Sequence, residues 1–181
     1  MPGKHVFPGG RISTEDRRPW CFEQDDSPAS PPVRELKAGA RAAIRELYEE
    51  TGLLIGQKRQ GQSVQGSAGR AIETAFLDNG IWPELDGAAY IARAITPKQS
   101  LIRFNTLFYL VTRDCVQGSI RSNGELVEID WYDVSQCDGL DMADVTRFML
   151  SYVVDPANRS AKRKPLYCYR LRIPRVLYRA E

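Results

Sequence analysis

The sequence contains a single histidine, His5, among 181 residues. A zinc site built from several histidines is therefore excluded, and a Ser-His-Asp triad would have to include His5. The four cysteines lie far apart and form no CxxC pair, so we expect free thiols. A metal ion bound by this chain would have mostly oxygen ligands, which favours Mg²⁺ or Mn²⁺.

Long apolar runs and an excess of one charge are also missing. No segment approaches the roughly 18–20 apolar residues that span a bilayer, and the first residues lack the apolar core of a signal peptide. With 25 basic and 23 acidic residues, the net charge of +2 gives no general attraction to nucleic acid or to an anionic membrane. We expect a cytoplasmic protein without a membrane partner, folded as a single domain over residues 1–181.

The periodicity of the chain predicts both helices and strands. Apolar residues recur at steps of three and four from Leu36 to Thr51, which indicates an amphipathic helix, and Gly52 suits the left-handed position after its end. Further helices are expected at 70–78 and at 141–154, the latter with Asp141 as N-cap. We expect strands at 88–95, 103–113, 125–132 and from 165, a strand end at 4–8, and loops at 13–33 and 56–69. These elements predict an α/β domain with helices packed on a mixed sheet.

Three glutamates crowd the end of the first predicted helix, in the stretch RELYEETGL at 45–53. Glu46, Glu49 and Glu50 are three and four residues apart, so their carboxylates share one helix face. They repel one another by about 0.2–0.5 kcal/mol per pair, and the carbonyl end of a helix is already partly negative. Arg45 offsets part of this repulsion by reaching Glu49. A solvated acidic face is the alternative, but a bound divalent cation would relieve the remaining repulsion.

This stretch resembles the second half of the Nudix box, R-E-U-x-E-E-x-G-U, in which U is aliphatic. Arg45, Glu46, Leu47, Glu49, Glu50, Gly52 and Leu53 fill all of its specified positions. The resemblance implies a Nudix α/β/α sandwich with a mixed sheet. It also implies a hydrolase that cleaves a diphosphate bond in a nucleoside diphosphate linked to another group, with Mg²⁺ or Mn²⁺ activating water.

The first half of the box matches less well. Lys37 stands where the box has a glutamate, and Gly10 lies 35 positions before Arg45, 21 more than in the box. The extra residues place a long insert at about 13–33. Longer Nudix proteins that resemble a peroxisomal coenzyme A diphosphatase also carry a VFPGG turn, here residues 6–10, followed by an insert. Glu35 is an alternative to the lost acid, although it is two residues out of register.

The resemblance also implies roles for individual residues. Glu46, Glu49 and Glu50 would hold the cations together with the carbonyl of Gly9, and Arg45 would orient Glu49. Either Glu46 or an acid outside the box would be the general base, and Glu125 and Glu128 are the candidates; two solvent-facing acids are the alternative reading. For the substrate, a small nucleoside diphosphate derivative, the candidate contacts are Gly10, Arg93 and Arg103, although both arginines also fit a plain surface role.

Two features leave alternatives open. Residues 159–179 hold eight basic and no acidic side chains, which fits a protected edge strand better than nucleic acid binding. The Nudix sheet normally includes a long strand before the Gly-Gly turn, yet seven residues precede Pro8 here. Either Met1 is not the natural start, or the sheet lacks that strand and its free edge favours a homodimer. Lys37 also keeps open a Nudix-fold nucleotide sensor that does not cleave.

Overall fold

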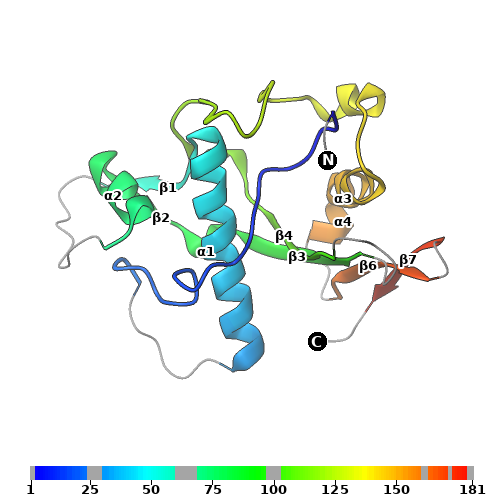
Figure 1. The fold of residues 1–181 in the computed structure, drawn as a ribbon, viewed down its shortest axis with the longest axis horizontal. Coiled ribbons are helices and arrows are strands. Elements are labelled where there is room, and N and C mark those ends of the chain that lie inside the picture. The colour runs from blue at the N-terminus through cyan, green and yellow to red at the C-terminus, as the bar shows by residue number, and fades with distance from the viewer. Residues whose placement is uncertain are drawn as a thin grey trace. The chain divides into compact units, whose positions relative to one another are not determined.

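The computed structural model describes residues 3–23, 30–59, 69–96, 103–159, 163–170 and 173–178. The chain divides into two compact units. We call residues 8–89 and 111–130 the α1 unit, and residues 1–7, 90–110 and 131–181 the four-stranded unit. Each unit is built from its own helices and its own sheet (Figure 1). The expectation of one domain over residues 1–181 stays a prediction.

The α1 unit is organised by α1, Pro31–Thr51, which begins five residues before the predicted start at Leu36. Pro31 occupies the first helical position, where its missing N–H costs no hydrogen bond. The buried side of the helix includes Ala38, Ala42 and Ile44, as the apolar spacing predicts. Gly52 ends the helix in the left-handed conformation, with φ 75°, and its N–H donates to the Tyr48 carbonyl at 2.8 Å. The predicted helix and its stop are confirmed.

The chain after α1 forms the central strand of a three-stranded sheet in the order β2-β1-β5. β1, Leu54–Lys58, pairs antiparallel with β2, Ile81–Pro83, and with β5, Val116–Gln117. Leu54 and Ile55 are almost fully buried, so the apolar run after Gly52 anchors this sheet. The loop expected at 56–69 was therefore placed three residues too early, since Gly56, Gln57 and Lys58 pair with β2. Part of that loop, 60–68, lies outside the described residues.

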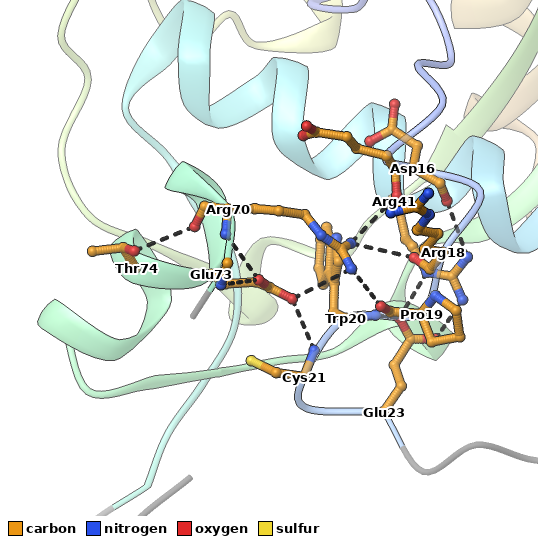
Figure 2. Close-up of polar contacts among 12 residues, drawn as sticks. Asp16, Arg18, Pro19, Trp20, Cys21, Glu23, Arg41, Arg70, Glu73 and Thr74 are labelled. Atoms are coloured by element: carbon orange, nitrogen blue, oxygen red, sulfur yellow. Dashed lines mark hydrogen bonds and ion pairs between the residues drawn. The ribbon is translucent and has the colours of Figure 1, made fainter. Parts of the chain in front are cut away.

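The insert at 13–23 is bound to α2, Ala71–Asp78, which confirms the helix predicted at 70–78 (Figure 2). Arg70 precedes α2 and donates to three carbonyls of the insert, those of Glu15, Arg18 and Pro19. The buried Glu73 accepts the N–H of Cys21 at 2.8 Å. It also accepts the N–H groups of Gly69 and Arg70, which precede the helix, at 3.0 and 3.1 Å. The described part of the insert is thus fixed to α2 through its backbone.

A second anchor joins the insert to α1. The buried Arg41 donates two hydrogen bonds of 2.6 Å to the carboxylate of Glu23 and a third, of 3.1 Å, to the Asp16 carbonyl (Figure 2). Such paired N–H···O contacts fix direction as well as distance. Trp20 is buried between these anchors and packs against Phe76 of α2, with ring centroids 5.6 Å apart. The insert is therefore part of the folded core of this unit.

The four-stranded unit contains a mixed sheet in the order β4-β3-β6-β7 (Figure 1). β3, Ala89–Ile95, and β4, Asn105–Leu110, confirm two predicted strands. β6, Pro165–Arg170, runs parallel to β3 and pairs antiparallel with β7, Ile173–Tyr178. The tail is thus a hairpin and not one strand, with β7 at the edge of the sheet. Its mixture of parallel and antiparallel pairs confirms the predicted α/β class with a mixed sheet.

Helices cover part of this sheet. α3, Asp144–Val154, contributes Met149 and Phe148 to a core that contains Ile91 of β3 and Tyr167 of β6. The remaining helical elements are short and are α4 (Pro156–Arg159), η1 (Leu85–Gly87), η2 (Arg113–Cys115) and η3 (Val134–Gly139). No helix within the described ranges combines the length and the apolarity that a membrane crossing requires.

Three local predictions were wrong. The segment 125–132 forms a bend followed by irregular backbone, and Glu128 has a positive φ of 56°, which breaks an extended strand. The segment 4–8 forms a single β-bridge, between His5 and Met142. Asp141 does not cap α3; its carboxylate pairs with Lys4 at 2.7 Å, and Ala143 is the N-cap. In each case a contact distant in sequence or an unusual backbone angle replaces the local preference.

Gly52 provides a test of how α1 ends. The left-handed backbone of Gly52 alone should make Gly52→Ala lower the free energy of unfolding by about 1–2 kcal/mol. The added methyl would also collide with the Arg121 side chain, so we expect the total loss to exceed this value. Gly80 is the matched control, since its φ is also positive, 62°, but a methyl there meets open space. Urea unfolding measures both variants. Equal losses would show that Arg121 does not pack against the helix end.

Candidate functional site

The three glutamates of the predicted metal site occupy the last two turns of α1. They differ in exposure: the side chains of Glu46 and Glu49 are 16% and 48% exposed, whereas Glu50 as a residue is 8% exposed. They lie at the carbonyl end of the helix, where the backbone adds partial negative charge. Neighbouring groups must therefore compensate a concentrated negative charge.

Arg45 provides most of this compensation. Its Nη1 donates to Glu46 Oε1 and to Glu49 Oε2, both at 2.9 Å. Its Nε and Nη2 donate to the two carboxylate oxygens of Asp16 at 3.0 and 2.9 Å, and Nη2 also donates to the Arg11 carbonyl at 3.0 Å. All five N–H groups of the guanidinium thus have acceptors. Hydrogen bonding to Asp16, followed by that to Glu46, raises the pKa of Arg45.

Asp16 is a residue of this site that the sequence did not reveal. Its side chain is buried and accepts the Ser13 N–H at 2.7 Å in addition to Arg45. Burial alone would raise the pKa of Asp16, but the hydrogen bonds from Arg45 and Ser13, together with the charge of Arg45, lower it below its ordinary value. Asp16 lies 29 positions before Arg45, in a segment without periodicity, so no local pattern could have linked the two.

The Gly9-Gly10 turn lies against two of the glutamates, as the resemblance implies. The Gly9 N–H donates to Glu50 Oε2 at 2.9 Å. Gly10 approaches Glu46 so closely that a methyl group on its Cα would overlap the Glu46 carboxylate. A side chain at position 10 would therefore have to displace the Glu46 carboxylate. The expected role of the Gly9 carbonyl as a ligand stays a prediction, since the described contact of Gly9 is made by its N–H.

Glu50 carries a charge that the protein does not fully offset. Burial raises its pKa, and repulsion from Glu46, Glu125 and Glu49 raises it further, against the stabilising N–H of Gly9. Unlike Glu46 and Glu49, it makes no ion pair with Arg45 or with any other described residue. A cation close to Glu50 would remove this penalty.

Of the two acids expected beyond the box, Glu125 is close enough for its charge to raise the pKa of Glu50. It is exposed and lies on a turn that Asn123 stabilises, because Asn123 Oδ1 accepts the Glu125 N–H at 2.9 Å. The sequence predicted a strand here, but the turn is what brings Glu125 to the glutamates. The role expected of Glu128 stays a prediction.

The donor set fits Mg²⁺ or Mn²⁺ chemically, because it consists of carboxylate oxygens with uncompensated charge. In the described part of the chain, however, no three acidic, histidine or cysteine side chains converge closely enough to hold a metal ion. The contacts above explain this separation, since Arg45 draws Glu46 and Glu49 toward itself while Gly9 holds Glu50. Binding a cation would require at least one carboxylate to rotate away from these partners.

The remaining predicted positions lie on β3, just before β4 and in the first half of α1. Arg93 of β3 donates to Asn105 of β4 at 2.6 Å, and Arg103 is exposed just before β4. Both belong to the four-stranded unit, whereas the glutamates belong to the α1 unit. Lys37 is exposed. Glu35, the alternative to the lost acid, pairs with Arg17 at 2.7 Å and lies about 16 Å along the helix from Glu46. Glu35 is therefore not part of the glutamate cluster in this structure.

Comparison with known proteins supports the fold. No protein-family model matches the chain, and a search of curated proteins also found no match. Among solved structures, the crystal structure of a Nudix hydrolase from Alicyclobacillus acidocaldarius is similar, with a TM-score of 0.57 and 24% sequence identity. The similarity covers 84% of this chain and 77% of that chain. The predicted Nudix-type α/β fold with a mixed sheet is confirmed.

The Asp16–Arg45 pair gives stability a dependence on pH. At pH 7 we expect Asp16→Asn to lower the free energy of unfolding by about 1.5–3 kcal/mol, the range for hydrogen bonds to charged groups. The folded pKa of Asp16 lies below its ordinary 3.8, so this contribution is complete well above that value and is lost as the pH falls through the folded pKa. Urea unfolding at pH 7, 5 and 3 measures it.

The control for this experiment is Asp86→Asn, which removes an exposed carboxylate of the same unit. The difference between wild type and Asp16→Asn should stay constant down to about pH 5 and shrink below about pH 4. A difference that grows on acidification would contradict the lowered pKa.

Proposed function

We propose that this chain hydrolyses a diphosphate bond in a nucleoside diphosphate linked to another group, with Mg²⁺ or Mn²⁺ as cofactor. The observation that supports this most strongly is the arrangement of Glu46, Glu49 and Glu50 around Arg45, with the Gly9-Gly10 turn packed against it. This arrangement occurs in a chain with a Nudix-type fold. Its buried, repelled Glu50 carboxylate is the feature that a cation would stabilise.

Each residue has a role in this proposal. Glu46, Glu49 and Glu50 bind the cation, with the Gly9 carbonyl as a further ligand. The cation supplies charge neutralisation of the diphosphate and lowers the pKa of the attacking water. Arg45 remains bonded to Asp16 and orients Glu49. Glu125 accepts the proton of the attacking water, because it is the exposed carboxylate beside the cluster, and Glu46 is the alternative base.

The substrate is proposed to be a small nucleoside diphosphate derivative, with coenzyme A-like molecules and nucleotide sugars as the first compounds to test. Gly10, Arg93 and Arg103 are its proposed contacts. The four cysteines are unpaired thiols, which fits the proposed cytoplasmic location because thiols persist in a reducing compartment.

A second candidate is a nucleotide sensor that binds without cleaving. Two observations favour it: Lys37 replaces an acid of the box, and two of the three glutamates are engaged by Arg45. Incubation with ADP-ribose, coenzyme A, nucleotide sugars and dinucleoside polyphosphates, with Mg²⁺ or with EDTA, separates the candidates. The hydrolase should release a phosphorylated product with Mg²⁺ and none with EDTA. Binding of a nucleotide without turnover of any compound would establish the sensor.

The glutamates themselves give the sharpest test of the reaction. We expect Glu49→Gln and Glu50→Gln each to lower kcat by about 10²–10⁴-fold, because each removes a charged cation ligand. Glu35→Gln is the matched control, since Glu35 lies on the same helix and pairs with Arg17. Steady-state kinetics at saturating Mg²⁺ measures all three. Unchanged kcat in both site variants would refute their assignment as ligands.

Gly10 tests the packing of the turn on the site. The methyl group of Gly10→Ala would displace the Glu46 carboxylate, so we expect the dissociation constant for Mn²⁺ to rise at least about tenfold, a change of 1.4 kcal/mol. Gly139→Ala is the control, because a methyl there meets nothing within 4 Å and φ is not positive. Isothermal titration calorimetry measures the affinity. An unaltered Mn²⁺ affinity would mean that Glu46 is not a ligand.

A further inference from the structure

An open pocket of about 300 Å³ lies beside the glutamate cluster, at the carboxyl end of α1. The end of α1 lines it with Tyr48, Glu49 and Gly52. The loop after β5 lines it with Arg121, Ser122 and Asn123. All of these residues belong to the α1 unit. Since Glu49 is a proposed cation ligand, the pocket opens next to the proposed site of reaction.

Arg121 is held over this pocket by contacts with the helix end. Its backbone N–H donates to the Thr51 carbonyl at 2.8 Å, and its side chain packs against the bare Cα of Gly52. Its Nη2 donates to Tyr48 Oη at 3.0 Å, with the guanidinium carbon 5.4 Å from the centre of that ring. The guanidinium is thus oriented before any ligand arrives, which reduces the entropy lost on binding.

The lining presents mainly hydrogen-bond donors. Tyr48 Oη accepts from Arg121, which leaves its O–H as a donor. Asn123 Oδ1 accepts the Glu125 N–H, which leaves its NH₂ group. Ser122 Oγ accepts from the Gly124 N–H and donates its one hydrogen to the Leu126 carbonyl, so it has no donor left for a ligand. Arg121, Tyr48 and Asn123 thus keep donors that no described group uses, and a ligand with several acceptor atoms would complement them.

The charge of Arg121 points to the same kind of ligand. Among the described residues no carboxylate lies within ion-pair distance of its guanidinium, in contrast to Arg41 and Arg45, which are both paired. Glu49 is the single acid of the lining, and its Oε2 already accepts from Arg45. A multidentate anion such as phosphate matches the planar guanidinium. A cation held by the glutamates would offset the repulsion between such an anion and Glu49.

We propose that this pocket binds a phosphate group of the substrate through Arg121, with Asn123 and Tyr48 as further donors. This proposal rests on the proposed hydrolase function and extends it, because it assigns substrate recognition to the loop that follows β5. Arg121 and the proposed base Glu125 then lie on one loop, tied to α1 through the Thr51 carbonyl.

The probe for this test is methylenediphosphonate, whose P–C–P bridge is not hydrolysed, titrated by calorimetry in buffer containing Mg²⁺. Arg121→Gln removes the charge. Asn123→Asp keeps the oxygen that accepts from Glu125 but replaces the NH₂ donor with a negative oxygen. Arg34→Ala removes an exposed arginine at the other end of α1 and serves as the control. Thermal unfolding of each variant shows that the fold is retained.

We expect both Arg121→Gln and Asn123→Asp to weaken binding at least about tenfold, and Arg34→Ala to change it less than twofold. Adenosine, which has no phosphate, should bind equally to all four proteins. Wild-type affinity for methylenediphosphonate in Arg121→Gln would overturn the proposal, as would absence of binding to the wild type.

The two proposals fail separately. If the wild type hydrolyses no diphosphate but binds the probe through Arg121, the hydrolase proposal fails and the phosphate pocket stands. If hydrolysis depends on Glu49 and Glu50 while Arg121→Gln keeps both its affinity for the probe and its KM, the pocket assignment fails and the hydrolase proposal stands. A purely structural role of Arg121 would lower the thermal midpoint without this loss of probe affinity.

Discussion

The fivefold hydrogen bonding of Arg45 is the interaction on which the organisation of the α1 unit depends. Three carboxylates at the negative end of a helix would repel one another and the helix dipole. Arg45 binds two of them and reaches back to Asp16 and to the Arg11 carbonyl, so one side chain joins the acidic face to the segment that precedes the helix. Among the described residues, the Gly9 N–H is the hydrogen-bond donor to Glu50, and the proposed cation would offset the charge that Arg45 leaves unpaired there.

The long insert must keep the Gly9-Gly10 turn beside the glutamates of α1. Gly10 and Arg45 are 35 residues apart, yet the Gly9-Gly10 turn contacts Glu50 and Glu46 directly. Arg41 of α1 fixes the described part of the insert by donating to a backbone carbonyl and to Glu23. Next to and within α2, Arg70 donates to a second carbonyl and Glu73 accepts a backbone N–H. The insert therefore extends the chain between the two halves of the site without separating them in space.

Periodicity and one spaced motif predicted the helix at 36–51, its glycine stop, the strands at 88–95 and 103–113, and the candidate glutamates. The sequence missed what depends on contacts between distant segments. β2 and β5 are too short to show an alternating pattern, and Asp16 has no local signal because its partner is 29 residues away. The segment 125–132 has strand-like composition, but a positive φ at Glu128 and the turn at Asn123 decide its shape.

The central claim is that the end of α1 binds a divalent cation once at least one of its carboxylates rotates away from Arg45 or Gly9. A crystal structure of the protein with millimolar Mn²⁺, with anomalous scattering recorded at the manganese edge, tests this directly. The account requires an anomalous peak within about 2.0–2.6 Å of oxygens from at least two of Glu46, Glu49 and Glu50, the range for hard cations with oxygen ligands, with the Asp16–Arg45 pair intact. An absent peak, with Glu46 and Glu49 still bonded to Arg45, would contradict it.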